Sequence, residues 1–73
     1  MPNARFTLQA LEELTLPQRD SIVRMLRNEH IRGIDVQLGG FDLPDGYLFF
    51  RKDYADGSTP LYGGISPEGD VST

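Results

Sequence analysis

Glycine is confined to the second part of this chain, and this division limits the folds that the chain can adopt. All eight glycines lie at or after Gly33, whereas the preceding residues are rich in Leu, Glu, Gln and Arg. The first composition favours helix, and the second is typical of strands joined by turns. Because 73 residues suffice for one small domain, we expect a single domain of residues 1–73, helical over 1–33 and a sheet over 34–73.

Two helix signals lie in the first part. Three leucines recur every third residue after Thr7, which predicts a short helix. Thr15 and Gln18 have the spacing of a capping box, in which each side chain bonds to the backbone of the other residue. Apolar residues then recur at helical spacing, so we expect a longer helix from about Leu16 to Ile31, with Gly33 as its terminating residue.

Strand signals fill the second part. Residues 34–38 alternate apolar and polar side chains, which predicts a strand with one buried face. The segments 47–54 and 59–65 are strand-like and are separated by a turn, so we expect a hairpin. After a second turn, residues 70–73 can return as a short edge strand. The expected fold is α+β, an N-terminal helix or helix pair packed on a three- to four-stranded antiparallel β meander.

The acidic residues also gather in the second part. The net charge is −4; up to Gly33 five arginines offset four acids, whereas from Ile34 onward two basic residues stand against seven acidic ones. This excess makes nucleic acid an unexpected partner, because nonspecific binding to phosphates relies on an excess of Lys and Arg. It favours a basic protein surface as the partner. The alternative interpretation is that these acids, several of them beside glycine, serve only turns and solubility.

No residue pattern indicates catalysis. The chain has no cysteine, which excludes disulfides and thiol chemistry. The one histidine, His30, falls in the last turn expected of the longer helix, where it meets the helix dipole. Two Asp-x-x-Asp-Gly segments at 42–46 and 53–57 lack the ligand ladder of a calcium loop, and no phosphate-binding loop is present. We therefore expect no enzyme, no catalytic residue, no cofactor and no metal.

Neither a membrane span nor a signal peptide is evident. No apolar run approaches the roughly 18 residues of a transmembrane helix, and the first six residues lack the basic and then apolar layout of a signal peptide. We expect a cytoplasmic protein with no membrane partner.

The segment 14–26 resembles the helix opening of winged-helix repressors of the MarR type, and arginines add positive charge to it. The resemblance covers about a dozen residues. It implies a small dimeric nucleic-acid-binding regulator that uses the arginine-bearing helix. A DNA reader of that kind needs a further recognition helix, whereas glycine and strand pattern begin here at Gly33. The alternative is a capped amphipathic helix with solvated arginines.

The strand expected over 47–54 carries large apolar side chains on both faces, because Leu48 and Phe50 alternate with Phe49. A sheet covered by helices on one face normally presents polar residues on the other. One face of the sheet is therefore expected to bind a partner. The alternative is that the short first helix or the loop at 41–43 covers it.

We interpret the chain as a non-catalytic protein–protein interaction module, a stoichiometric inhibitor or adaptor with an acidic and aromatic sheet surface. One form of this hypothesis is a phage or mobile-element anti-defence inhibitor that occupies a basic nucleic-acid channel. The expected partner is a larger protein with a basic surface, and a homodimer through the aromatic face is a second interpretation. The residues expected to bind the partner are Asp42, Asp45, Tyr47, Phe49, Asp53, Asp56 and Tyr62.

Overall fold

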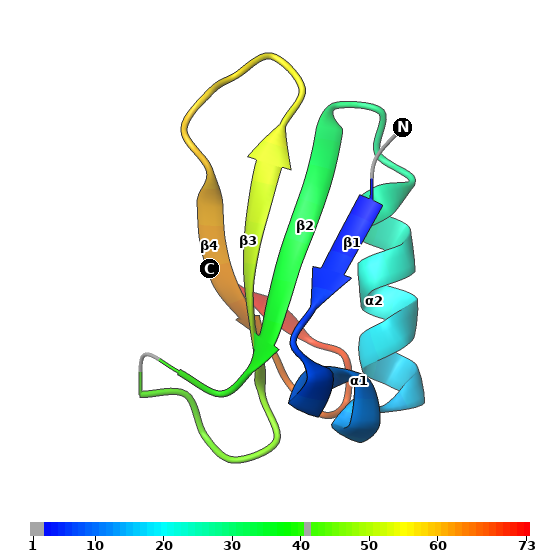
Figure 1. The fold of residues 1–73 in the computed structure, drawn as a ribbon, viewed down its shortest axis with the longest axis vertical. Helices are drawn as coiled ribbons and strands as arrows, with labels where there is room; N and C mark the ends of the chain where they lie inside the picture. Colours follow the sequence, from blue (N-terminus) through cyan, green and yellow to red (C-terminus); the bar gives the residue numbers. More distant parts are fainter. Residues whose placement is uncertain (1–2, 41) are drawn as a thin grey trace.

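The structure is a computed structural model that describes residues 3–40 and 42–73. Within these residues, two helices and a five-stranded sheet with the strand order β1-β2-β3-β4-β5 are formed (Figure 1). In chain order the elements are β1 (Asn3–Phe6), α1 (Leu8–Glu13), α2 (Leu16–Leu26), β2 (Ile31–Leu38), β3 (Leu48–Tyr54), β4 (Leu61–Ile65) and β5 (Val71–Ser72). The expected α+β class and the helix-on-sheet arrangement are confirmed.

The sheet is mixed, which differs from the expected antiparallel meander of three to four strands. From β2 to β5 each neighbouring pair is antiparallel, and the hairpin and the short final edge strand are confirmed. The prediction missed β1, which pairs in parallel with β2 and brings Ala4 beside Ile34. A four-residue strand whose partner lies about thirty residues away is not joined to it by a hairpin turn, so the sequence contains no turn signal beside it.

The longer helix is shorter than predicted. Its capping box is present, because Gln18 N donates to Thr15 Oγ1 and Thr15 N donates to Gln18 Oε1. The helix ends at Leu26, not Ile31, because the Asn28 side chain accepts a hydrogen bond from His30 N and forms a turn that competes with helix. Gly33 therefore lies inside β2 and does not terminate the helix.

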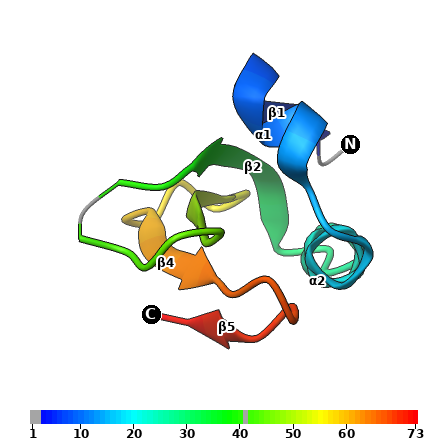
Figure 2. The ribbon, with the colours of Figure 1, turned by 90° about the horizontal axis from the view of Figure 1, so that it is seen from below.

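The core lies between the sheet and the helices. Figure 2 shows α2 end-on along one side of the sheet, and α1 adds Ala10, which is fully buried. The helix-facing side chains alternate with those of the opposite face along β3 and along β2 from Ile34 onward, whereas a register shift between Ile31 and Gly33 interrupts the alternation at the start of β2. The buried apolar residues are Ala10, Ile22, Ile31, Ile34, Val36, Leu48, Phe50 and Ile65.

A buried polar seam joins the start of α2 to the sheet. Gln18 is fully buried, and its Nε2 donates to Gly46 O at 2.8 Å and to Ile65 O at 3.2 Å. One turn further on, the Ser21 hydroxyl donates to the carbonyl of Gly69, in the turn that precedes β5. These bonds satisfy polar groups that the helix–sheet packing removes from water.

Candidate interaction surface on the open sheet face

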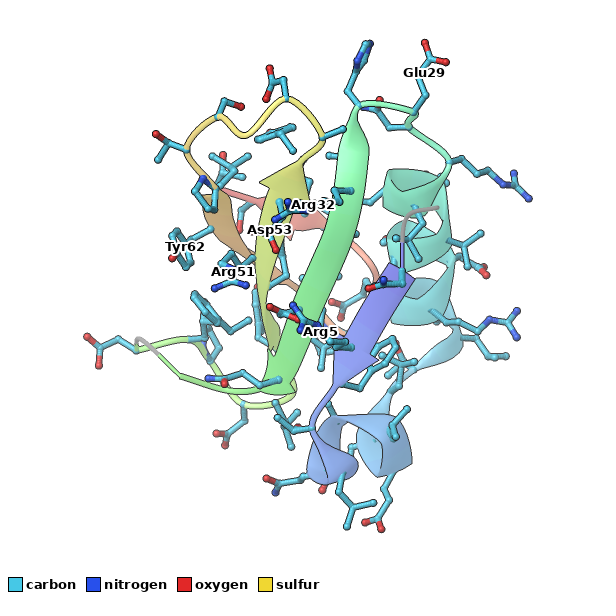
Figure 3. The ribbon with its side chains drawn as sticks, turned by 45° about the horizontal axis from the view of Figure 1, so that its top comes forward. Arg5, Glu29, Arg32, Arg51, Asp53 and Tyr62 are labelled. Carbon is cyan, nitrogen blue, oxygen red and sulfur yellow. The ribbon has the colours of Figure 1, made fainter. Side chains whose placement is uncertain are left out.

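One face of the sheet is not covered by the helices, and the strand register arranges its side chains in rows. The central row takes one residue from each of four neighbouring strands, in the order Arg5, Asp35, Arg51 and Tyr62. Figure 3 shows Arg5, Arg51 and Tyr62 on this side of the sheet. We call the uncovered side the open face.

Ion pairs link the charged members of this row. Arg5 Nε lies 2.7 Å from Asp35 Oδ1, and Arg5 Nη2 donates to Asp35 Oδ2 at 3.1 Å. Arg51 Nη2 donates to the same Asp35 Oδ2 at 2.6 Å and to Asp53 Oδ2 at 3.2 Å. Four side chains from three strands are thus joined in one network.

Arg51 is the centre of the network. Its pKa is raised above the ordinary value, chiefly by the charge of Asp53 and further by that of Asp35, while burial opposes the shift. Its buried Nε lies 3.2 Å from Asp53 Oδ1, at an angle that leaves the N–H without a hydrogen bond among the described residues. The network keeps the guanidinium charged and its orientation constrained.

Aromatic side chains occupy the other half of the open face. The rings of Phe49 and Tyr62 are stacked, with centroids 5.8 Å apart and planes 21° from parallel. Beside them lies a shallow depression of about 530 Å³. Its other lining residues are Leu43, Gly63, Gly64, Ser72 and Thr73. The surface is predominantly apolar here, in contrast to the charged half over β1 to β3.

The loop between β2 and β3 covers part of this half. Leu43 Cδ2 lies 3.0 Å from the position that a Cβ on Gly64 would occupy, so the leucine rests against the strand at its glycine. The alternative that residues 41–43 cover the second face therefore holds locally at Leu43, while Phe41 lies outside the described residues. Tyr62 remains 52% exposed.

The four aspartates expected to bind a partner do not gather at one place. Asp42 and Asp45 are exposed in the connection between β2 and β3, and Asp56 is exposed in the turn between β3 and β4. These two connections lie at opposite ends of the sheet (Figure 1). Asp53 is only 9% exposed and is paired with Arg51. The acidic side chains therefore flank the open face at both ends.

The three aromatic residues expected at the site share this region. Phe49 and Tyr62 are brought together from β3 and β4, whereas Tyr47 is half-buried just before β3. Tyr47 Cδ2 lies 3.6 Å from the position that a Cβ on Gly64 would occupy. Phe49 and Tyr62 therefore line the depression, and Tyr47 lies beside Gly64 at its edge.

Sequence reasoning missed the arginines of this face. Arg5 lies on the unpredicted β1, and Arg32 was assigned to the helical part but lies in β2. In Figure 3, Arg32 lies next to Asp53 on the open face. Asp35 and Arg51 carried a usable signal, because each is a charged residue at an alternate position of a strand.

Apart from Asp53, the residues weighed for chemistry lie outside the ion-pair network of this surface. His30 follows α2 in an exposed turn, not in a last helical turn as predicted. Gly46 and Gly57 have positive φ, so both Asp-x-x-Asp-Gly segments form turns at that point. Among residues 3–40 and 42–73, no three His, Cys, Asp or Glu side chains are placed to share a metal ion.

Two findings concern the chain as a whole. No helix in the described part of the chain has the length and apolar character needed to cross a membrane. The chain matches no protein-family profile, and no curated protein or solved structure is significantly similar to it.

Proposed function

We propose that this protein is a non-catalytic binding module that docks on a larger protein through the open face of its sheet, as a stoichiometric inhibitor or adaptor. The observation that carries the proposal is the stacked pair of Phe49 and Tyr62 beside an uncovered depression. Aromatic side chains next to a concave apolar surface are typical anchors of protein interfaces.

The charged row supports the same proposal. Arg5, Asp35 and Arg51 hold one another in place before any partner arrives, so little side-chain freedom is lost when they are covered. Charged groups around an apolar anchor select partners and fix their orientation. The exposed Asp42, Asp45 and Asp56 at the ends of the sheet are proposed to meet basic residues at the edge of the partner's surface.

The alternative of a nucleic-acid-binding regulator has less support. Arg19 is exposed beside Asp20, and Arg24 donates to the Ser21 hydroxyl. Arg32, which would have added to the charge of the helix, lies on the sheet. The arginines of α2 therefore form a weaker positive patch than their number suggests, and among the described residues after α2 no further helix is present that could enter a DNA groove.

Affinity capture tests the proposed function. The tagged protein and its Tyr62→Ala variant are incubated with nuclease-treated lysate of the source cells, and Leu16→Ala, at an exposed leucine of α2, is the matched control. We expect one protein in near-equimolar amount with the wild type and with Leu16→Ala, and its loss with Tyr62→Ala. Retention of that protein by Tyr62→Ala, or recovery only of nuclease-sensitive material, would contradict the proposal.

A further inference from the structure

The open face has more unused hydrogen-bond donors than unused acceptors. All four carboxylate oxygens of Asp35 and Asp53 lie within 3.2 Å of an arginine nitrogen. Each guanidinium, in contrast, has five N–H groups, of which Arg5 and Arg51 use only some. Within the described residues, the Arg32 guanidinium has no ion pair and no hydrogen bond. A partner group that supplies acceptors therefore matches this face better than one that supplies donors.

These donors surround a hollow of about 230 Å³ above Gly33, which is lined by Asn3, Arg5, Arg32 and Asp53. Gly33 leaves room on the sheet surface because it has no side chain: a Cβ there would lie 3.2 Å from Asn3 O. Asp53 is a like charge for an incoming carboxylate, but Arg5 and Arg51 together balance the charges of Asp35 and Asp53, so Arg32 adds a net positive charge beside the hollow. Two guanidiniums and an amide then face the hollow, and this set suits a carboxylate.

Resting on the proposed function, we infer that the partner segment carries an Asp or Glu that enters the hollow above Gly33 and a bulky apolar residue that enters the depression beside Tyr62. From Gly33 to Gly64, which lines the depression, the register spans two strands and four residues of strand length, which is about 16 Å. An extended segment covers this distance in about five residues. The inferred motif is therefore an acidic and an apolar side chain about five positions apart.

A protein segment is a better match than a nucleic acid. The exposed acids at both ends of the open face, Asp42 and Asp45 at one and Asp56 at the other, would repel a backbone that carries one phosphate per nucleotide. A peptide supplies a single carboxylate at the hollow and neutral or basic residues beside it. The charge pattern thus favours a local acidic group over a continuous polyanion.

Selection from a random 12-residue peptide library tests this inference. The immobilised wild-type chain is compared with Tyr62→Ala, and the enriched peptides are sequenced. We expect enrichment of Asp or Glu about five positions from Phe, Leu or another bulky apolar residue. A labelled peptide chosen from this set then serves as the probe in fluorescence anisotropy.

Arg32→Ala is the decisive variant. Among the described residues the Arg32 side chain has no ion-pair or hydrogen-bond partner, so its removal is not expected to disturb the fold. We expect this substitution to raise the dissociation constant of the labelled peptide at least about tenfold. Arg27→Ala removes an exposed arginine next to α2 and is expected to leave binding unchanged. Equal binding by wild type and Arg32→Ala would overturn the inference.

Other outcomes separate the inference from the proposed function. If the enriched peptides depend on Tyr62 but lack acidic residues, the carboxylate site is wrong and the protein-binding function stands. If no enrichment depends on Tyr62, both are overturned. If a labelled 12-nucleotide oligouridylate binds wild type and loses affinity with Arg32→Ala and Tyr62→Ala, the open face binds nucleic acid, and both are again overturned.

Discussion

Gln18 shows how one polar side chain can hold together parts of the chain that are distant in sequence. It is fully buried, yet its amide donates to Gly46 O and Ile65 O and accepts from Thr15 N. The sequence predicted its capping role from spacing alone. It did not reveal the two carbonyl partners, which depend on how the loops return to the helix.

Replacement of Gln18 by leucine is expected to destabilise the protein by about 2 kcal/mol, because the buried carbonyl of Ile65 would lose its donor and the capping box would be lost. The free energy of unfolding in urea measures this change. Gln9→Leu, at an exposed position of α1, is the control and is expected to change stability little. A Gln18→Leu variant as stable as wild type would show that these bonds contribute nothing net.

The pKa of Asp56 is a second prediction for a single residue. Its carboxylate is bonded by the Ser58 hydroxyl and the Ser58 backbone N–H, which lower its pKa below the ordinary value of 3.8. Because the pKa is lowered by folding, the associated stabilisation is present above the unfolded pKa and is lost as pH falls through the folded one. NMR titration of the Asp56 carboxyl should show a rise in pKa in Ser58→Ala, whereas Ser58→Thr keeps the hydroxyl and should preserve the low value.

At the level of elements, those that depend on residues close in sequence were predicted correctly, whereas the strand that depends on pairing with a distant segment was not. Both helix starts, the hairpin and the final edge strand each rest on residues close in sequence, and each was found. The end of α2 was wrong because the Asn28 turn has no periodicity to detect. The strand β1 was missed because its parallel partner, β2, lies beyond both helices.

The glycines of β4 lead to a prediction for the strand as a unit. A Cβ on Gly63 would collide with the carbonyl of Ser72 and would lie 2.8 Å from the Phe50 ring, so β5 could not remain paired as it is. We expect Gly63→Ala to cost about 2 kcal/mol in the free energy of unfolding and to speed amide exchange at Ser72. Gly64→Ala would crowd the movable Leu43 side chain and would meet Tyr47 only at an ordinary contact distance, so a smaller loss is expected. Equal losses would contradict this account.

On the scale of the whole molecule, the two faces of the sheet have separate roles. The odd and even residues of β3 were correctly assigned to two faces, and the apolar Leu48 and Phe50 lie in the core while Phe49 lies on the open face. The acidic binding surface could not be placed from sequence, because strand order decides which carboxylates meet an arginine. Asp35 is paired for this reason, whereas Asp53 meets Arg51 two residues away on its own strand.

Amide hydrogen exchange followed by NMR should rank the strands. The central strands β2 and β3 each have neighbours on both sides and contribute most of the buried apolar side chains, so their amides should exchange slowest. The two-residue β5 is an exposed edge, and its amides should exchange fastest among the strands. Protection of β5 equal to that of β3 would contradict the ranking.

The central row of the open face takes a single side chain from each of four strands, at positions 5, 35, 51 and 62. No stretch of fewer than twelve residues holds two of them, and none of fewer than 28 residues holds three. Linear peptides cut from this protein should therefore fail to compete for its partner. Conversely, a bound partner should raise the melting temperature, because only the folded chain offers the complete epitope.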